Sequence, residues 1–100
     1  MSFGSFLRGM RKKENIGIKR LAPQLDISYT YLSKLENDKV IPSKDVIERI
    51  AYYFRYDLDE LLISADKVPD DIRRILRENP KEAAALLRRT FGDASKESHP

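Results

Sequence analysis

Apolar residues recur at intervals of three and four along most of this 100-residue chain. Residues at that spacing lie on one side of a helix, so the recurrence marks the face that each helix would bury. The pattern predicts helices near residues 3–13, 18–25, 29–36, 44–54 and 58–63. Little else is indicated before residue 64, so this part of the chain is predicted to be all-α.

Residues suited to helix starts stand where the pattern places them. Ser28 and Ser43 each precede a predicted helix, and a serine hydroxyl there can accept a hydrogen bond from a backbone N–H of the first turn. Asp57 and Glu60 have the spacing of a capping box, in which each side chain accepts the other residue's backbone N–H. Pro23 falls inside the second helix, where it removes a donor, so we expect that helix to bend or to be short.

The segment 18–37 predicts two short helices that meet at a tight turn. Its inward residues are Leu21, Ala22, Leu25, Leu32 and Leu35, with Ile27 at the turn. Its outward residues on the second of these helices are Tyr29, Thr30, Tyr31 and Lys34. A helix that buries only two leucines and exposes hydrogen-bonding side chains favours a partner surface. Proteins place side chains in a DNA groove with this arrangement.

Further marks extend this motif from about Phe6 to Leu62. They are Leu21-Ala22, Ile27-Ser28, Leu32, Leu35-Glu36-Asn37, Pro42-Ser43 and Leu58-Asp59-Glu60-Leu61-Leu62. In this register the chain resembles the Cro/C1-type (XRE) helix-turn-helix family of bacterial and phage regulators. The resemblance implies a five-helix, lambda-repressor-like DNA-binding domain over residues 1–63.

The resemblance also implies roles for individual residues. The base-reading positions would be Tyr29, Thr30 and Lys34, whose side chains can meet base edges in the major groove. Contacts to the DNA backbone would come from Lys19, Arg20, Ser28, Tyr31, Asn37, Lys39 and Ser43. Arg11 and Glu36 would form a structural ion pair between the first and third helices. Alternatively, the tyrosines pack over the edge of the core. For Tyr31 the motif favours DNA contact over packing, whereas for Tyr29 the two roles are about equally favoured.

Besides Pro23, two further positions depart from the family pattern. Ile18 stands where the family often has a glutamine that reaches a phosphate, so that contact is absent here. Asp38 stands where the family usually has glycine in the left-handed conformation, which aspartate adopts at some cost.

Composition and charge agree with a small DNA-binding domain. The net charge is only +3, but residues 1–20 hold six basic residues against the single acid Glu14. Such an asymmetry suits an edge that faces phosphates, although a solvated helix face is the ordinary interpretation of a charge run. The chain has no cysteine, no long apolar run and no signal-peptide pattern, so we expect a cytoplasmic protein. No metal, cofactor or enzymatic activity is expected, because the chain has no nucleophile–base pair and no cluster of metal ligands.

Residues 64–92 lie outside the motif and predict two short helices. The sequence Val68-Pro69-Asp70-Asp71 is a helix start, and Asn79-Pro80 separates the two helices. Apolar residues that could form a dimer interface are Ile72, Ile75, Leu76, Leu86 and Leu87. Alternatively, these helices cover the domain's own core. Residues 93–100, which include the only histidine, His99, are expected to be a disordered tail.

The function that follows is sequence-specific binding of double-stranded DNA by a transcriptional regulator. So compact a chain leaves no room for a sensor domain, which favours a repressor that binds a palindromic operator as a dimer. The alternative is an antitoxin-like autorepressor whose C-terminal helices bind another protein. The resemblance implies a toxin or a metallopeptidase as that partner, because some relatives with a similar tail are encoded beside such a protein. A protein-interaction module without DNA binding is disfavoured, because the outward face of the third helix is polar and basic.

Overall fold

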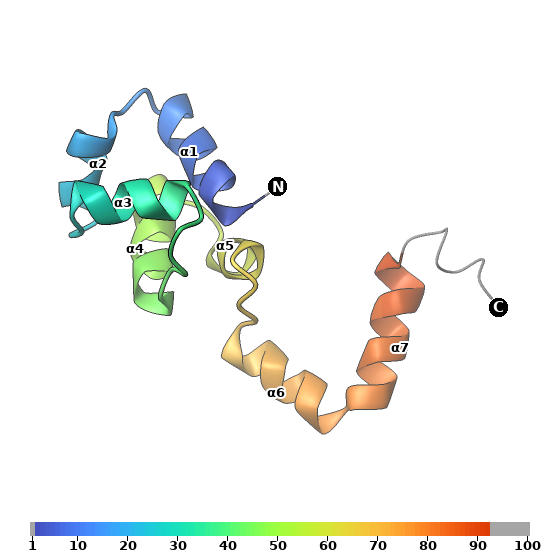
Figure 1. Cartoon of the computed structure of the whole chain (residues 1–100). Coiled ribbons are helices and arrows are strands. Elements are labelled where there is room, and N and C mark those ends of the chain that lie inside the picture. Colours follow the sequence, from blue (N-terminus) through green and yellow to red (C-terminus); the bar gives the residue numbers. More distant parts are fainter. Residues whose placement is uncertain (1, 93–100) are drawn as a thin grey trace. The chain divides into compact units, whose positions relative to one another are not determined.

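The computed structural model describes residues 2–92, and all regular structure in that range is helical (Figure 1). The helices are α1 (Phe3–Lys13), α2 (Ile18–Gln24), α3 (Tyr29–Glu36), α4 (Lys44–Phe54), α5 (Leu58–Ser64), α6 (Asp70–Glu78) and α7 (Pro80–Phe91). The prediction of five helices followed by two further helices is confirmed. The expected tail at 93–100, with His99, lies outside the described residues.

The chain divides into two compact units. The N-terminal unit is Met1–Lys67 and contains α1 to α5, and the C-terminal unit is Val68–Pro100 and contains α6 and α7.

The N-terminal unit encloses one apolar core to which all five helices contribute. The largest fully buried side chains are Leu7, Leu21, Leu25, Leu32, Leu35, Ile47, Ile50 and Leu61. Within this unit α3 packs against both α1 and α2, and α4 packs against α5. Burying one leucine or isoleucine contributes roughly 1.5–3 kcal/mol, so these side chains are the main source of the unit's stability.

Polar side chains begin four of the five core helices. The capping residues Ser2, Ser28, Ser43 and Asp57 accept hydrogen bonds from the backbone N–H groups of Ser5, Tyr31, Val46 and Glu60. Only half of the predicted capping box is present. The Asp57 carboxylate accepts the Glu60 N–H at 2.9 Å, but Glu60 Oε1 accepts the Tyr56 hydroxyl at 2.6 Å instead of a backbone donor. This phenol hydrogen bond to Glu60 is the largest cause of a raised pKa at Tyr56.

Each of the five core helices is followed by the same left-handed turn. The residues with positive φ are Asn15, Asp26, Asp38, Arg55 and Asp66, at 54° to 60°. At the end of α3, for example, the Lys39 N–H donates to the Lys34 carbonyl at 2.8 Å across Asp38. Glycine adopts this conformation most easily, yet none of the five is glycine. The expectation that Asp38 is left-handed is confirmed.

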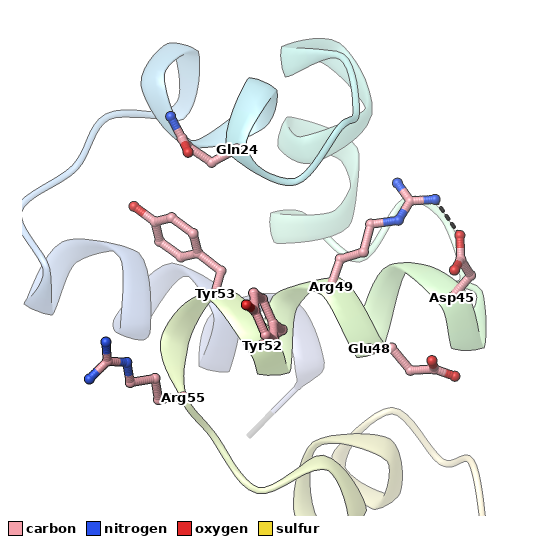
Figure 2. A pocket seen from close by; sticks show the side chains of 7 residues that line it. All are labelled: Gln24, Asp45, Glu48, Arg49, Tyr52, Tyr53 and Arg55. Carbon is pink, nitrogen blue, oxygen red and sulfur yellow. Dashed lines mark hydrogen bonds and ion pairs between the residues drawn. The ribbon is translucent and has the colours of Figure 1, made fainter.

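Helix α2 is short, only seven residues, and contains Pro23. The two carbonyls that follow it accept hydrogen bonds from another helix. Arg49 of α4 donates from Nη1 to the carbonyls of Leu25 and Asp26 at 3.0 and 3.2 Å, and its Nη2 forms an ion pair with Asp45 (Figure 2). This arginine therefore ties α4 to the end of α2 and helps to place the turn before α3.

The C-terminal unit is a pair of helices joined through one residue, Asn79. Asn79 ends α6 and begins α7. Its Nδ2 donates to the Ile75 carbonyl at 3.0 Å, and its own carbonyl accepts the Ala83 N–H at 2.8 Å. No residue of α6 or α7 is buried, and Leu76 is only half-buried.

Candidate nucleic-acid interface

The outward face of α3 carries the predicted base-reading side chains. Tyr29, Thr30 and Lys34 are exposed, whereas Leu32 and Leu35 of the same helix are buried in the core. Because Ser28 caps the first turn of α3, the exposed tyrosine and threonine occupy its N-terminal end. A helix with this face can present a hydroxyl, a methyl group and an ammonium group to base edges.

The two tyrosines of α3 differ in their surroundings. Tyr29 is 54% exposed, whereas Tyr31 is half-buried and packs against the core. The ammonium of Lys19 on α2 lies 5.7 Å from the centroid of the Tyr29 ring, within the range of a cation–π contact. Tyr29 is thus more accessible to a DNA partner than Tyr31. The sequence favoured DNA contact more strongly for Tyr31 than for Tyr29.

Most of the predicted backbone-contacting residues are exposed. These are Lys19, Arg20, Ser28, Asn37, Lys39 and Ser43. The hydroxyls of Ser28 and Ser43 act as acceptors in the helix caps at 3.1 and 3.2 Å, so their own O–H groups can still donate to another acceptor.

Arg11 and Glu36 form a close, largely buried ion pair between α1 and α3. Arg11 Nε lies 2.5 Å from Glu36 Oε2 and Nη2 lies 2.9 Å from Oε1, and the Glu36 side chain is only 1% exposed. The hydrogen bond to Glu36 raises the pKa of Arg11. Arg11 Nη1 also donates to the Ile16 carbonyl at 3.1 Å. The pair fixes the end of α3 against α1.

Arg8 is a second arginine at this junction that the sequence reasoning missed. Its Nε donates to Glu36 Oε1 at 3.3 Å, and its Nη2 donates to the Glu36 carbonyl at 3.3 Å and to Asn37 Oδ1 at 2.9 Å. Arg8 and Arg11 are three residues apart on a helix and so share one face. That spacing was the signal that could have identified it.

The carboxylate of Asp38 binds the first turn of α1. Its Oδ1 accepts the Gly4 N–H at 2.9 Å. Hydrogen bonds from the Ser2 side chain and from this N–H lower the pKa of Asp38. A Cβ atom at Gly4 would lie 2.6 Å from the carbonyl oxygens of Leu35 and Glu36, so the close approach of α1 to the end of α3 requires glycine there. Neither contact is indicated by the spacing of residues in the sequence.

Comparison with known proteins decides the family. Residues 4–67 match the family model of a helix-turn-helix domain. This chain belongs to the Cro/C1-type helix-turn-helix family. The matched residues coincide closely with the N-terminal unit, so the helix-turn-helix domain is the part of the chain that carries the junctions described above.

Similar proteins come from a phage and from bacteria. The helix-turn-helix chain is 31% identical over 68 residues to the ImmF control region 10 kDa protein of Bacillus phage phi105, covering 68% of this chain and 76% of that protein. It is 34% identical over 62 residues to an uncharacterized HTH-type transcriptional regulator of Mycobacterium tuberculosis and 36% identical over 62 residues to the HTH-type transcriptional activator BcrR of Enterococcus faecalis. These matches cover 62% of this chain but only 44% and 30% of the two bacterial proteins.

A solved structure resembles the fold of the helix-turn-helix chain. It is the crystal structure of the clp gene regulator ClgR from Corynebacterium glutamicum, with a TM-score of 0.56 and 21% sequence identity. The match covers 91% of this chain and 92% of that one. This likeness concerns the fold alone.

The helix-turn-helix domain also has an open groove of about 850 Å³ between α2 and α4 (Figure 2). Its lining is Gln24, Asp45, Glu48, Arg49, Tyr52, Tyr53 and Arg55. Two carboxylates line it, and one of them, Asp45, is paired with Arg49. Among residues 2–92 no group of histidine or acidic side chains could hold a metal ion, and no helix is long and apolar enough to cross a membrane.

Proposed function

We propose that this protein is a cytoplasmic transcriptional regulator that binds double-stranded DNA in a sequence-specific manner through α3. The observation that carries the proposal is the outward face of α3, where Tyr29, Thr30 and Lys34 are exposed. The end of this helix is held against α1 by the ion pair between Arg11 and Glu36. Membership of the helix-turn-helix family supports it. In such proteins the second helix of the motif enters the major groove with its N-terminal residues toward the base edges.

The exposed residues divide into two kinds of contact. Lys34 can donate to the O6 and N7 acceptors of guanine, and Thr30 can offer a hydroxyl or a methyl group. Lys39, in the loop that follows α3, is suited to a phosphate because a flexible ammonium carries charge without fixed geometry. Base contacts discriminate between sequences, whereas phosphate contacts supply affinity and register.

Paired mutations test this division. Lys34→Ala should lose about 1–3 kcal/mol on the preferred duplex and should relax the preference at one position. Lys39→Ala should weaken all duplexes alike and should reduce the slope of affinity against salt by about one unit. The preferred duplex is first obtained by selecting bound fragments from a random pool. Failure of the pool to yield any shared sequence would contradict sequence-specific binding, and an equal loss of preference in both variants would contradict the division.

We further propose that the regulator acts as a homodimer that represses from a palindromic operator. The support is the C-terminal unit, in which Ile72, Ile75, Leu86 and Leu87 remain 40% to 55% exposed and Leu76 is half-buried. Apolar residues gathered in this way mark an interaction surface. A dimer would place two α3 helices roughly 34 Å apart, one turn of DNA.

Sedimentation of the full chain tests the dimer. A dimer at tens of micromolar that dissociates on Leu87→Asp supports it, because a charge at the interface must be desolvated. A monomer at that concentration contradicts the dimer and favours the other candidate, a DNA-binding autorepressor whose exposed apolar residues meet a different protein such as a toxin or a metallopeptidase.

A further inference from the structure

We propose that Arg8 is a positioning residue that orients the side-chain amide of Asn37 so that its N–H points at a phosphate of the bound duplex. This inference rests on the proposed function, since it concerns how the same surface holds DNA. Asn37 directly follows α3 as its C-cap, and it is exposed. Arg8 lies on α1, and its guanidinium contacts the Asn37 amide.

The amide of Asn37 is held from both ends. Its Oδ1 accepts from Arg8 Nη2 at 2.9 Å, and its Nδ2 donates to the Ser33 carbonyl at 2.8 Å. An amide nitrogen has two N–H groups, so one remains after the bond to Ser33. The remaining group is a donor, which is what a phosphate oxygen requires.

Arg8 and the Ser33 carbonyl together decide which way the amide faces. A guanidinium has only donors, so it can face the oxygen of the amide and not its nitrogen. Arg8 therefore fixes Oδ1 toward α1, and Nδ2 is left on the opposite side. Without Arg8 the amide keeps only its bond to the Ser33 carbonyl, so it turns over and presents its oxygen outward more often. An outward oxygen repels a phosphate, so the contact would be lost in part of the population.

Arg8 is itself anchored independently of Asn37. Its Nε and Nη2 also donate to the side chain and the carbonyl of Glu36, both at 3.3 Å. Glu36 does not depend on Arg8, because Arg11 binds both of its carboxylate oxygens at 2.5 and 2.9 Å. The Arg8 side chain is 39% exposed against 12% for Arg11. Removing Arg8 should therefore change DNA binding more than it changes folding.

The experiment measures the affinity of the full chain for the selected duplex at several salt concentrations. Lys12→Ala is the matched control, because Lys12 is an exposed cation of the same helix without a side-chain hydrogen bond to α3. Arg8→Ala should bind roughly fivefold more weakly than Lys12→Ala with the same salt slope, which corresponds to one hydrogen bond. Arg8→Lys, which keeps a donor, should recover part of the loss. Thermal unfolding of each variant shows whether the fold is kept.

The decisive comparison is made without the Asn37 side chain. In an Asn37→Ala background, Arg8→Ala and Lys12→Ala should weaken binding equally, because Arg8 then has no amide to orient. If Arg8→Ala keeps its extra loss in that background, or shows none in the unmodified chain, Arg8 does not act through Asn37 and the inference is overturned. If the unmodified chain binds no duplex at all, the proposed function itself fails.

Discussion

The two units of this chain treat their apolar residues in opposite ways. In the N-terminal unit, leucines and isoleucines from five helices bury one another. In the C-terminal unit, no residue of α6 or α7 is buried, and Phe91 is 80% exposed. The comparison shows that the first unit supplies its own core, whereas the second leaves the apolar side chains of its helices only partly covered.

The largest test of this contrast is the same substitution in each unit. Leu32→Ala removes a side chain that is 0% exposed and should lower the free energy of unfolding by about 2–5 kcal/mol. Leu87→Ala removes one that is 46% exposed and should cost under about 1 kcal/mol while weakening self-association. Urea unfolding and sedimentation measure the two effects. Equal losses of stability would show that the C-terminal unit is as well covered as the core.

A second test concerns the charges that the N-terminal unit buries. Arg11→Ala leaves the Glu36 carboxylate, 1% exposed, with Arg8 as its remaining ion-pair partner. We expect a loss of about 3 kcal/mol, because a buried charge is left partly uncompensated. Lys13→Ala, an exposed cation in the same turn, serves as the control. Similar melting temperatures for the two variants would mean that the ion pair adds nothing to stability.

A third test uses the left-handed turns, which occur in the N-terminal unit and at no described residue of the C-terminal unit. Arg55 has φ 54° directly after α4, so Arg55→Gly should stabilise the fold by up to about 1 kcal/mol. Glu48→Gly, at an exposed position inside α4, should destabilise it by about the same amount. Chemical denaturation compares them. Destabilisation by both glycines would show that the turn stores no strain.

The smallest expected effect is the response of the N-terminal unit to acid. Bonds from Ser2 and Gly4 hold the pKa of Asp38 below its ordinary value of 3.8. The ionised carboxylate therefore contributes stability above pH 4, and this contribution is lost as the pH falls through the lowered pKa. Melting temperatures of the natural chain and of Asp38→Asn should differ at pH 7, and the difference should shrink as the pH falls below 3.8. A constant difference across that range would assign the effect to something other than ionisation.

Local signals predicted most of the fold. Helix α3 follows from the spacing of Leu32 and Leu35 and from Ser28 at its start, all within one short segment. The break between α6 and α7 follows from the Asn79-Pro80 pair. Proline disrupts a helix interior because it has no backbone N–H and its ring clashes with the preceding turn. Such features depend on neighbours a few residues away, which the sequence displays directly.

The junctions between helices could not be predicted in this way. The contacts of Arg8 with Glu36, of Arg49 with Leu25 and of Asp38 with Gly4 span 28, 24 and 34 residues. An exposed charge and a paired one look alike in a sequence, because the partner is set by how the helices pack. The same holds for Tyr29 and Tyr31, which are of one type and differ only in the direction that each takes around α3.

The single residue between α6 and α7 has a consequence for chain length. Exposed connections usually tolerate insertions. Asn79 forms hydrogen bonds with both α6 and α7, so this connection has no unconstrained residue. One alanine added beside it would separate the bond to α6 from the bond to α7, which one residue now makes. The direction in which α7 leaves α6 would then change, although no residue of either helix had been changed.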